Sequence, residues 1–212
     1  RPRSGTELLD AAFQLLRENF KLLFTVVLGA FLPIIGFEVL AAAEPTGGVA
    51  LLSMIVTVVF ESLASAAVIA VVSERYMGRS ITAGEALSRI WSRIGTVVGT
   101  SIVYSFIVAV GFLLLIIPGF YFATRFFAMM PAVVIENYNS STSQKRSSQL
   151  TDGSKMRVFG LFVVAWIIYL VLLGVAMGIG VGIFGEVAGV VIARILMAAV
   201  YPFLGIIVTL LY

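Results

Sequence analysis

The sequence contains no cysteine and no histidine. Their absence excludes disulfides, thiol nucleophiles, cysteine-ligated zinc and iron–sulfur clusters, and haem held by histidine. Charged residues are also scarce, because they make up 12% of the 212 residues, whereas an ordinary soluble domain has about 25%. So few charges cannot cover the surface of a soluble fold of this size. This composition excludes a soluble enzyme, a nucleic-acid binder and a disordered tail.

Apolar residues, in contrast, are abundant. They form 60% of the chain, and the mean hydropathy is +1.10. A helix that crosses the hydrocarbon core of a bilayer needs about 20 residues, and six apolar segments approach or exceed that length. The sequence therefore predicts an all-α, polytopic membrane protein with six transmembrane helices, at residues 22–43, 49–72, 95–117, 120–135, 158–180 and 187–211. The Pro118-Gly119 pair predicts a tight turn between the third and fourth helices.

The basic residues are concentrated in three segments that alternate with pairs of predicted spans. Twelve of the 14 lysines and arginines lie in residues 1–21, 75–93 and 145–157. The intervening turns near Glu44, Pro118 and Glu186 contain no basic residue. Cytoplasmic loops of membrane proteins carry an excess of lysine and arginine, so we expect the three basic segments and both termini to face the cytoplasm.

Each basic segment is also predicted to contain a helix that lies in the membrane interface. The first begins near Thr6 and has apolar residues at four-residue spacing from Leu8 to Phe20. The second begins at Thr82, which forms a capping box with Glu85, and an apolar stripe follows at Ala86, Ile90 and Ile94. Such amphipathic helices bind in the interface plane.

The third such helix, at residues 142–152, has Leu150 as its one large apolar residue, so we expect it to be weakly anchored. Each interfacial helix precedes a predicted hairpin of two spans. The chain is therefore interpreted as one transmembrane domain, residues 1–212, built from three loose repeats at 6–76, 82–136 and 142–212.

Residues 115–125, LIIPGFYFATR, are similar to a motif of a prokaryotic membrane protein family, and FAMMPAVVIE at 127–136 and LTDG to RVFG at 150–160 extend the similarity. The chain thus resembles the YciC-like proteins and the membrane domain of glycerophosphoryl diester phosphodiesterases. The resemblance implies a prokaryotic cytoplasmic membrane protein and a link to glycerophospholipid metabolism. It implies no hydrolase activity, since these residues offer no counterpart of the phosphodiesterase's catalytic barrel.

Four charged residues inside the predicted spans are the first candidate functional residues: Glu38, Glu61, Arg125 and Arg194. A charge at the bilayer centre costs at least about 2.5–3.5 kcal/mol, so it needs a partner or a purpose. Glu61 and Arg125 are interpreted either as an ion pair that fixes the helices or as part of a polar cavity for a lipid head group or small anion. Arg125 could instead extend to the outer interface. Arg194 has no obvious partner, and Glu38, a lipid phosphate or another subunit could supply one.

Two further groups of residues are candidates for binding. Small residues four apart let membrane helices approach closely, which marks five glycines for packing within the chain or for self-association: Gly174, Gly178, Gly182, Gly185 and Gly189. Basic residues near an anionic leaflet each gain about 1 kcal/mol, which marks six residues as candidates to bind lipid head groups: Arg17, Lys21, Arg89, Arg93, Lys155 and Arg157.

The sequence shows no catalytic constellation, so we predict no enzymatic activity and no cofactor or metal. The leading hypothesis is a non-catalytic membrane subunit that packs with other membrane proteins, with a second copy or with anionic lipids of the cytoplasmic leaflet, and so organises an assembly. One alternative is a transporter or lipid-handling protein with an internal polar cavity. Another is a membrane accessory to glycerophospholipid metabolism, which depends on the family resemblance alone.

Overall fold

The computed structural model describes residues 5–152 and 155–212, and every regular element in these ranges is an α-helix. The helices are α1 (Gly5–Glu18), α2 (Phe20–Ala43), α3 (Gly47–Tyr76), α4 (Ala83–Trp91), α5 (Ile94–Leu114), α6 (Ile116–Arg125), α7 (Met129–Ile135), α8 (Ser140–Thr151), α9 (Lys155–Phe184) and α10 (Glu186–Leu211). The predicted all-α class is therefore confirmed for the described residues.

Six segments of the described chain are long and apolar enough to cross a membrane. Five of them belong to α2, α3, α5, α9 and α10, and the remaining one, Ile116–Ile135, combines α6 with α7. These segments coincide with the six predicted spans, because a run of about 20 apolar residues is visible in the sequence whatever the helix packs against.

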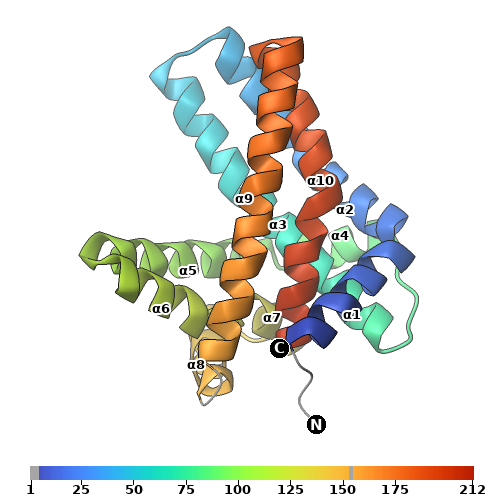
Figure 1. Cartoon of the computed structure of the whole chain (residues 1–212), viewed down its shortest axis with the longest axis vertical. Coiled ribbons are helices and arrows are strands. Elements are labelled where there is room, and N and C mark those ends of the chain that lie inside the picture. Colours follow the sequence, from blue (N-terminus) through green and yellow to red (C-terminus); the bar gives the residue numbers. More distant parts are fainter. Residues whose placement is uncertain (1–4, 153–154) are drawn as a thin grey trace.

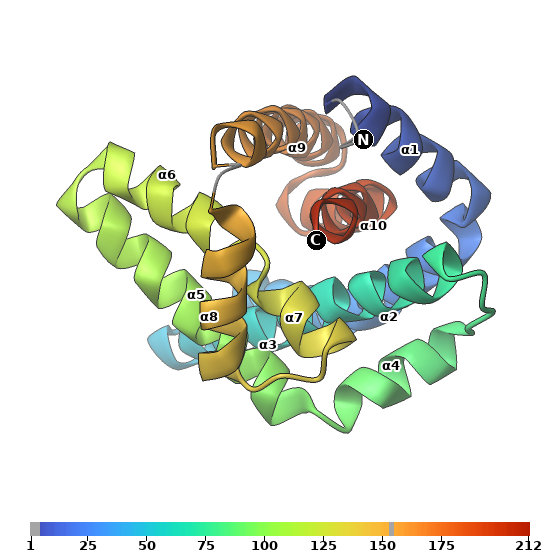
Figure 2. The ribbon, with the colours of Figure 1, turned by 90° about the horizontal axis from the view of Figure 1, so that it is seen from below.

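The helices do not all run in one direction. Figure 1 shows α9 and α10 side by side along the long axis of the molecule, whereas α5 and α6 form a hairpin that lies across that axis. Figure 2, seen from below, shows α1, α4, α7 and α8 around the end at which α10 finishes. The four short helices thus gather at one end of the molecule, and they carry Arg17, Arg89, Lys145 and Arg146.

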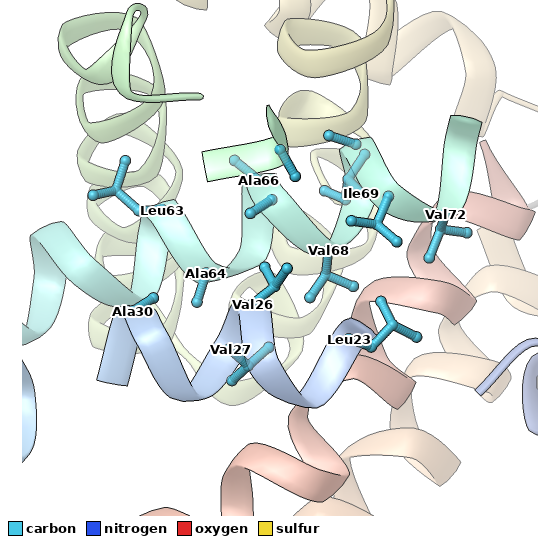
Figure 3. Close-up of a cluster of buried hydrophobic side chains, with 14 of the residues drawn as sticks. Leu23, Val26, Val27, Ala30, Leu63, Ala64, Ala66, Val68, Ile69 and Val72 are labelled. Atoms are coloured by element: carbon cyan, nitrogen blue, oxygen red, sulfur yellow. The ribbon is translucent and has the colours of Figure 1, made fainter. Parts of the chain in front are cut away.

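The core lies where α2, α3 and α10 pack together. Figure 3 shows Val26 of α2 directed toward Ala64 and Val68 on α3. These three residues and the neighbouring Val27 are fully buried. Helix α10 approaches α3 closely at Gly205, where an added Cβ atom would lie 2.6 Å from the Cγ1 atom of Val68. Small residues at these crossings let the helix backbones approach closely. The van der Waals contacts formed in this way stabilise helix packing in a membrane, where the hydrophobic effect does not drive helices together.

The fourth predicted span is interrupted, which corrects the expectation of one continuous helix at 120–135. Helix α6 ends at Arg125 and α7 begins at Met129. The turn before it also lies earlier than predicted: the backbone is extended at Leu115 (φ −168°, ψ 160°), and Pro118 sits in the first turn of α6. Proline is tolerated there because the first-turn amides have no intrahelical acceptor.

Helix α8 is held to the rest of the protein by buried hydroxyls, while its weak anchoring in the membrane interface stays a prediction. Its buried residues are Ser143, Ser147 and Thr151. The hydroxyls of Ser147 and Thr151 donate to the carbonyl oxygen of Arg125 (3.0 and 3.1 Å), and the amide of Ala128 donates to Ser147 Oγ (3.1 Å). The break between α6 and α7 leaves these backbone groups without helical partners, so hydroxyl hydrogen bonds replace the missing apolar stripe.

The predicted capping box of α4 is confirmed. The amide of Glu85 donates to Thr82 Oγ1 (3.3 Å), and the amide of Thr82 donates to Glu85 Oε2 (2.8 Å). The Glu85 carboxylate accepts hydrogen bonds from both the amide and the hydroxyl of Thr82. Both bonds lower the pKa of the Glu85 carboxyl, and the bond from the amide has the larger effect. The apolar stripe behind the box, however, packs on the protein itself, since Ala86 and Ile90 are buried.

Helix α1 is covered in the same way. Leu8 and Ala12 are buried, and the Phe13 ring packs on Phe203 of α10 with 4.6 Å between the ring centroids. The large apolar side chains that remain available for a membrane interface are Phe13 on α1 and Trp91 on α4, which are 57% and 58% exposed. The two predicted interfacial helices thus use most of their apolar faces to cover the core.

Candidate functional site

Three of the four charged candidates meet at one point between α2, α3 and α10. Arg194 Nε donates to both carboxylate oxygens of Glu38, at 3.1 and 2.9 Å, and Arg194 Nη2 also contacts Glu38 Oε1. Arg194 Nη1 donates to Glu61 Oε1 at 3.1 Å. We call Glu38, Glu61 and Arg194 the charged cluster. Of the partners considered for Arg194, the structure provides Glu38 and adds Glu61.

The fourth candidate, Arg125, does not join this cluster, so the expected ion pair between Glu61 and Arg125 is wrong. Arg125 instead donates to the hydroxyls of Tyr121 (2.7 Å) and Ser148 (2.6 Å), and its guanidinium lies 5.8 Å from the centroid of the Tyr121 ring. The reason is the direction of α6, which lies across the molecule and ends beside α8 (Figure 1).

The packing of α10 against α2 and α3 creates the charged cluster. Arg194 lies on the face of α10 next to buried Ala193 and Met197, and its guanidinium is 5.8 Å from the centroid of the Phe31 ring on α2. The hydroxyl of Tyr201, two turns further along α10, donates to the carbonyl oxygen of Glu61 (3.2 Å). The side chains of Arg194 and Glu38 are 22% and 21% exposed, which makes this pair well shielded.

The charged cluster contains two carboxylates and one guanidinium, so with all three groups ionised it carries one net negative charge. Glu38 takes both of its oxygens to Arg194, whereas Glu61 contacts Arg194 through Oε1. The Glu61 side chain is also the more exposed, at 38% against 21% for Glu38. Glu61 is therefore the acid whose charge is less fully balanced.

Glu61 also lines a cavity of about 540 Å³ between α3, α5, α7, α9, α10 and the segment that joins α6 to α7. Among the described residues the wall contains one carboxylate and no lysine or arginine. Besides the indole N–H of Trp166, its other polar side chains carry hydroxyls, from Ser62, Ser65, Thr100, Ser101, Tyr104, Ser105 and Tyr201. Arg125 does not line this cavity, so the structure separates the two residues that the polar-cavity interpretation had combined.

Thr100 is the one cavity hydroxyl that is both deeply buried and unpartnered. It is 1% exposed, and its Oγ1 atom has no hydrogen-bond partner. A buried hydroxyl without a partner costs about 1–3 kcal/mol. Two of the apolar lining residues, Val58 and Trp166, are 38% and 54% exposed.

The sequence analysis did not identify the hydroxyl-bearing residues that line the cavity, although their spacing in the sequence is a signal for them. Thr100, Ser101, Tyr104 and Ser105 stand at helical spacing in an otherwise apolar segment, as do Glu61 and Ser65. Residues four apart share one helix face, so each set marks a polar stripe. The sequence does not say that the two stripes face one space, because that depends on how α5 crosses α3.

The residues predicted to bind lipid head groups have different surroundings. Arg17 and Lys21 are exposed, and Arg89 is partly exposed while it pairs with Glu74 at 2.9 Å. Arg93 is occupied inside the protein, where its guanidinium donates to Val133, Asn137 and Tyr138 at 2.7–3.2 Å. The side chains of Lys155 and Arg157 lie outside the part that the structure describes.

The five glycines selected from the sequence also differ in their surroundings. Gly189 packs against α9 so closely that a Cβ atom there would lie 2.4 Å from the amide nitrogen of Val181. Gly185 has φ +80° and forms the turn between α9 and α10. Gly174, Gly178 and Gly182 are exposed, and nothing outside the helix lies within 4 Å of a Cβ atom added to any of them. These three glycines are therefore not used for packing within the described chain.

A second polar cluster lies outside the spans, where Glu136 Oε1 accepts hydrogen bonds from Arg146 Nε (3.0 Å) and from the Tyr212 hydroxyl. Burial raises the pKa of the Glu136 carboxyl, but the hydrogen bonds from Tyr212 and Arg146 outweigh it, and the pKa is lowered overall. The pKa of the Arg146 guanidinium is raised, chiefly by the hydrogen bond to Glu136.

This lowered pKa predicts how stability depends on pH. Because the folded protein holds Glu136 below the unfolded pKa of 4.5, its stabilisation is present above that pH and is lost as the pH falls through the folded value. Thermal unfolding of wild type and Glu136→Gln should therefore differ most above pH 5 and converge on acidification. A difference that stays constant from pH 7 to pH 3 would contradict this assignment.

No family model, no curated protein and no solved structure matches the chain. The resemblance to the YciC-like and glycerophosphoryl diester phosphodiesterase membrane family therefore stays a prediction.

Proposed function

We propose that the chain is a non-catalytic integral membrane subunit that packs against another membrane helix and organises an assembly. The observation that carries this proposal is the open glycine stripe on α9, formed by Gly174, Gly178 and Gly182. Its neighbours on the same helix are large exposed apolar residues, including Val171, Val175 and Ile179. Glycines between apolar side chains form a shallow groove into which a second helix fits closely.

The pairing of the charged residues supports the same proposal. A transporter of polar substrates in which Glu61, Arg125 and Arg194 bind the cargo needs these side chains around one space. Here Arg194 is shared between two carboxylates, and Arg125 is held by hydroxyls of α6 and α8. Such pairing fixes the arrangement of helices, which is what a subunit needs to present a constant surface.

The orientation in the membrane is part of the proposal. Helices α1 and α4 lie at the end of the molecule seen in Figure 2. Helix α1 carries Arg17, α4 carries Arg89, and Lys21 follows α1 in the first turn of α2. We propose that this end faces the cytoplasm and anionic lipid, in line with the positive-inside rule. Cysteines introduced at Arg17 and at Glu186 test it, since a membrane-impermeant thiol reagent applied to intact cells should label Glu186→Cys and not Arg17→Cys.

The assembly is tested first by gentle extraction of the full chain from native membranes, followed by mass spectrometry of co-purifying proteins. A stoichiometric complex, or a homo-oligomer, supports the proposal. A monomer that carries lipid and no protein partner contradicts it.

A substitution in the stripe makes the test specific. We expect Gly178→Leu to dissociate the complex while the isolated chain keeps its thermal stability. The new side chain blocks the groove, and no described residue outside the helix lies within 4 Å of a Cβ atom added at Gly178. Gly160→Leu is the matched control. Gly160 is also open and also on α9, but it lies 18 residues away, about 27 Å along the helix. Equal effects of the two variants would show that the stripe is not the contact.

A further inference from the structure

The cavity beside Glu61 has the chemistry of a binding site for a positively charged organic molecule. We propose that it binds a small lipophilic cation with an alkylated ammonium group, which Glu61 pairs and the surrounding aromatic side chains cover. This proposal goes beyond the assembly function and does not depend on it, because the cavity and the glycine stripe are separate features.

The sign of the ligand's charge follows from the charged cluster. Two carboxylates share one guanidinium, and Glu61 is the acid that Arg194 contacts through a single oxygen. An unbalanced negative charge in a membrane segment is costly unless a cation accompanies it. Arg194 contacts Glu61 but is shared with Glu38, so one guanidinium faces two carboxylates. Among the described residues no lysine or arginine lines the cavity itself, so an anionic ligand there would meet a carboxylate and no basic side chain.

The remaining lining indicates the kind of cation. Trp166, Tyr104 and Phe127 contribute aromatic rings to the wall, and the faces of such rings attract alkylated ammonium groups. Met129 and Met130 add flexible apolar surface, which adapts to ligands of different shape. A small hydrated metal ion would gain little from these side chains, whereas an organic cation gains from both the charge and the rings.

Size and polarity are also consistent with this ligand class. A volume of about 540 Å³ falls within the roughly 300–1,000 Å³ of small-molecule sites. Thr100 presents a buried hydroxyl without a partner at this site. A ligand that carries a hydrogen-bonding group can therefore form a hydrogen bond with the Thr100 hydroxyl. Trp166 lines the cavity and is 54% exposed on the apolar helix α9, so we infer that a ligand dissolved in the bilayer enters beside it.

The two tryptophans of the chain allow a direct test. Trp166 lines the cavity, whereas Trp91 is exposed on α4. In a Trp91→Phe background, the fluorescence of Trp166 therefore reports on the cavity. Purified protein in detergent is titrated with benzyltrimethylammonium and, separately, with neopentylbenzene, which has the same shape and no charge. We expect a saturable change with the cation and none with the neutral compound at equal concentration.

The variants connect the signal to Glu61. Glu61→Gln should weaken binding of benzyltrimethylammonium at least tenfold, and Glu44→Gln, an exposed glutamate at the end of α2, should leave it unchanged. Ser105→Phe fills the cavity without altering the charged cluster and should abolish the change. If Glu61→Gln does not fold, the Ser105→Phe variant still tests whether the cation binds in the cavity.

Three results would overturn the proposal. They are the absence of a saturable change in the wild-type background, equal binding of the neutral compound, and unaltered binding in either Glu61→Gln or Ser105→Phe. The first result would also be expected if a proton, and not an organic cation, balances Glu61.

Discussion

Arg194→Gln is expected to lower the free energy of unfolding by about 3–5 kcal/mol, which is the usual cost of removing one partner from a buried ion pair. Arg194 contacts both Glu38 and Glu61, so its loss leaves two carboxylates close together with no positive charge between them. Equilibrium unfolding of the purified chain in mixed micelles, followed by the loss of helical circular dichroism, measures this change.

A second substitution shows whether the cost comes from uncompensated charge. Adding Glu38→Gln to the Arg194→Gln variant removes one of the two stranded carboxylates and should restore part of the lost stability. Arg89→Gln is the matched control, since the pair that Arg89 forms with Glu74 is partly exposed and such pairs contribute about 0–1 kcal/mol. If Arg194→Gln costs no more than Arg89→Gln, the charged cluster does not hold the helices together.

Gly180→Ala is expected to destabilise the hairpin of α9 and α10 by about 1–3 kcal/mol or more, the typical cost of overpacking. A Cβ atom at Gly180 would lie 2.6 Å from the carbonyl oxygen of Gly189. The obstacle is backbone, so no side chain can rotate away and the helices must separate. Thermal unfolding of the purified variant measures the effect.

Gly160→Ala provides the control for this prediction, because Gly160 is on the same helix and has nothing within 4 Å of an added Cβ atom. Alanine is favoured over glycine in a helix by about 0.5–1 kcal/mol, so this variant should be equally stable or more stable. Similar melting of the two variants would mean that α9 and α10 do not approach each other as closely as the structure indicates.

Local sequence determined much of the architecture, since the signals act over one or two helical turns. The apolar runs predicted the six candidate spans, and Thr82 with Glu85 predicted the start of α4. Some local signals were still misread. The Pro118-Gly119 pair suggested a turn, but proline is compatible with the first turn of a helix, and the chain turns at Leu115 instead.

The sequence by itself also identified Glu38, Glu61, Arg125 and Arg194 as charges that the membrane segments must accommodate. Only the tertiary structure decided how they are accommodated. Arg194 is 156 residues from Glu38 and 133 from Glu61, so their contact depends on how α10 crosses α2 and α3. Arg125 meets Ser148 because α6 ends beside α8. A charged residue within an apolar run can be recognised from the sequence, because burying its charge is unfavourable. The residue that pairs with it depends on how distant helices cross, and no local sequence pattern encodes that crossing.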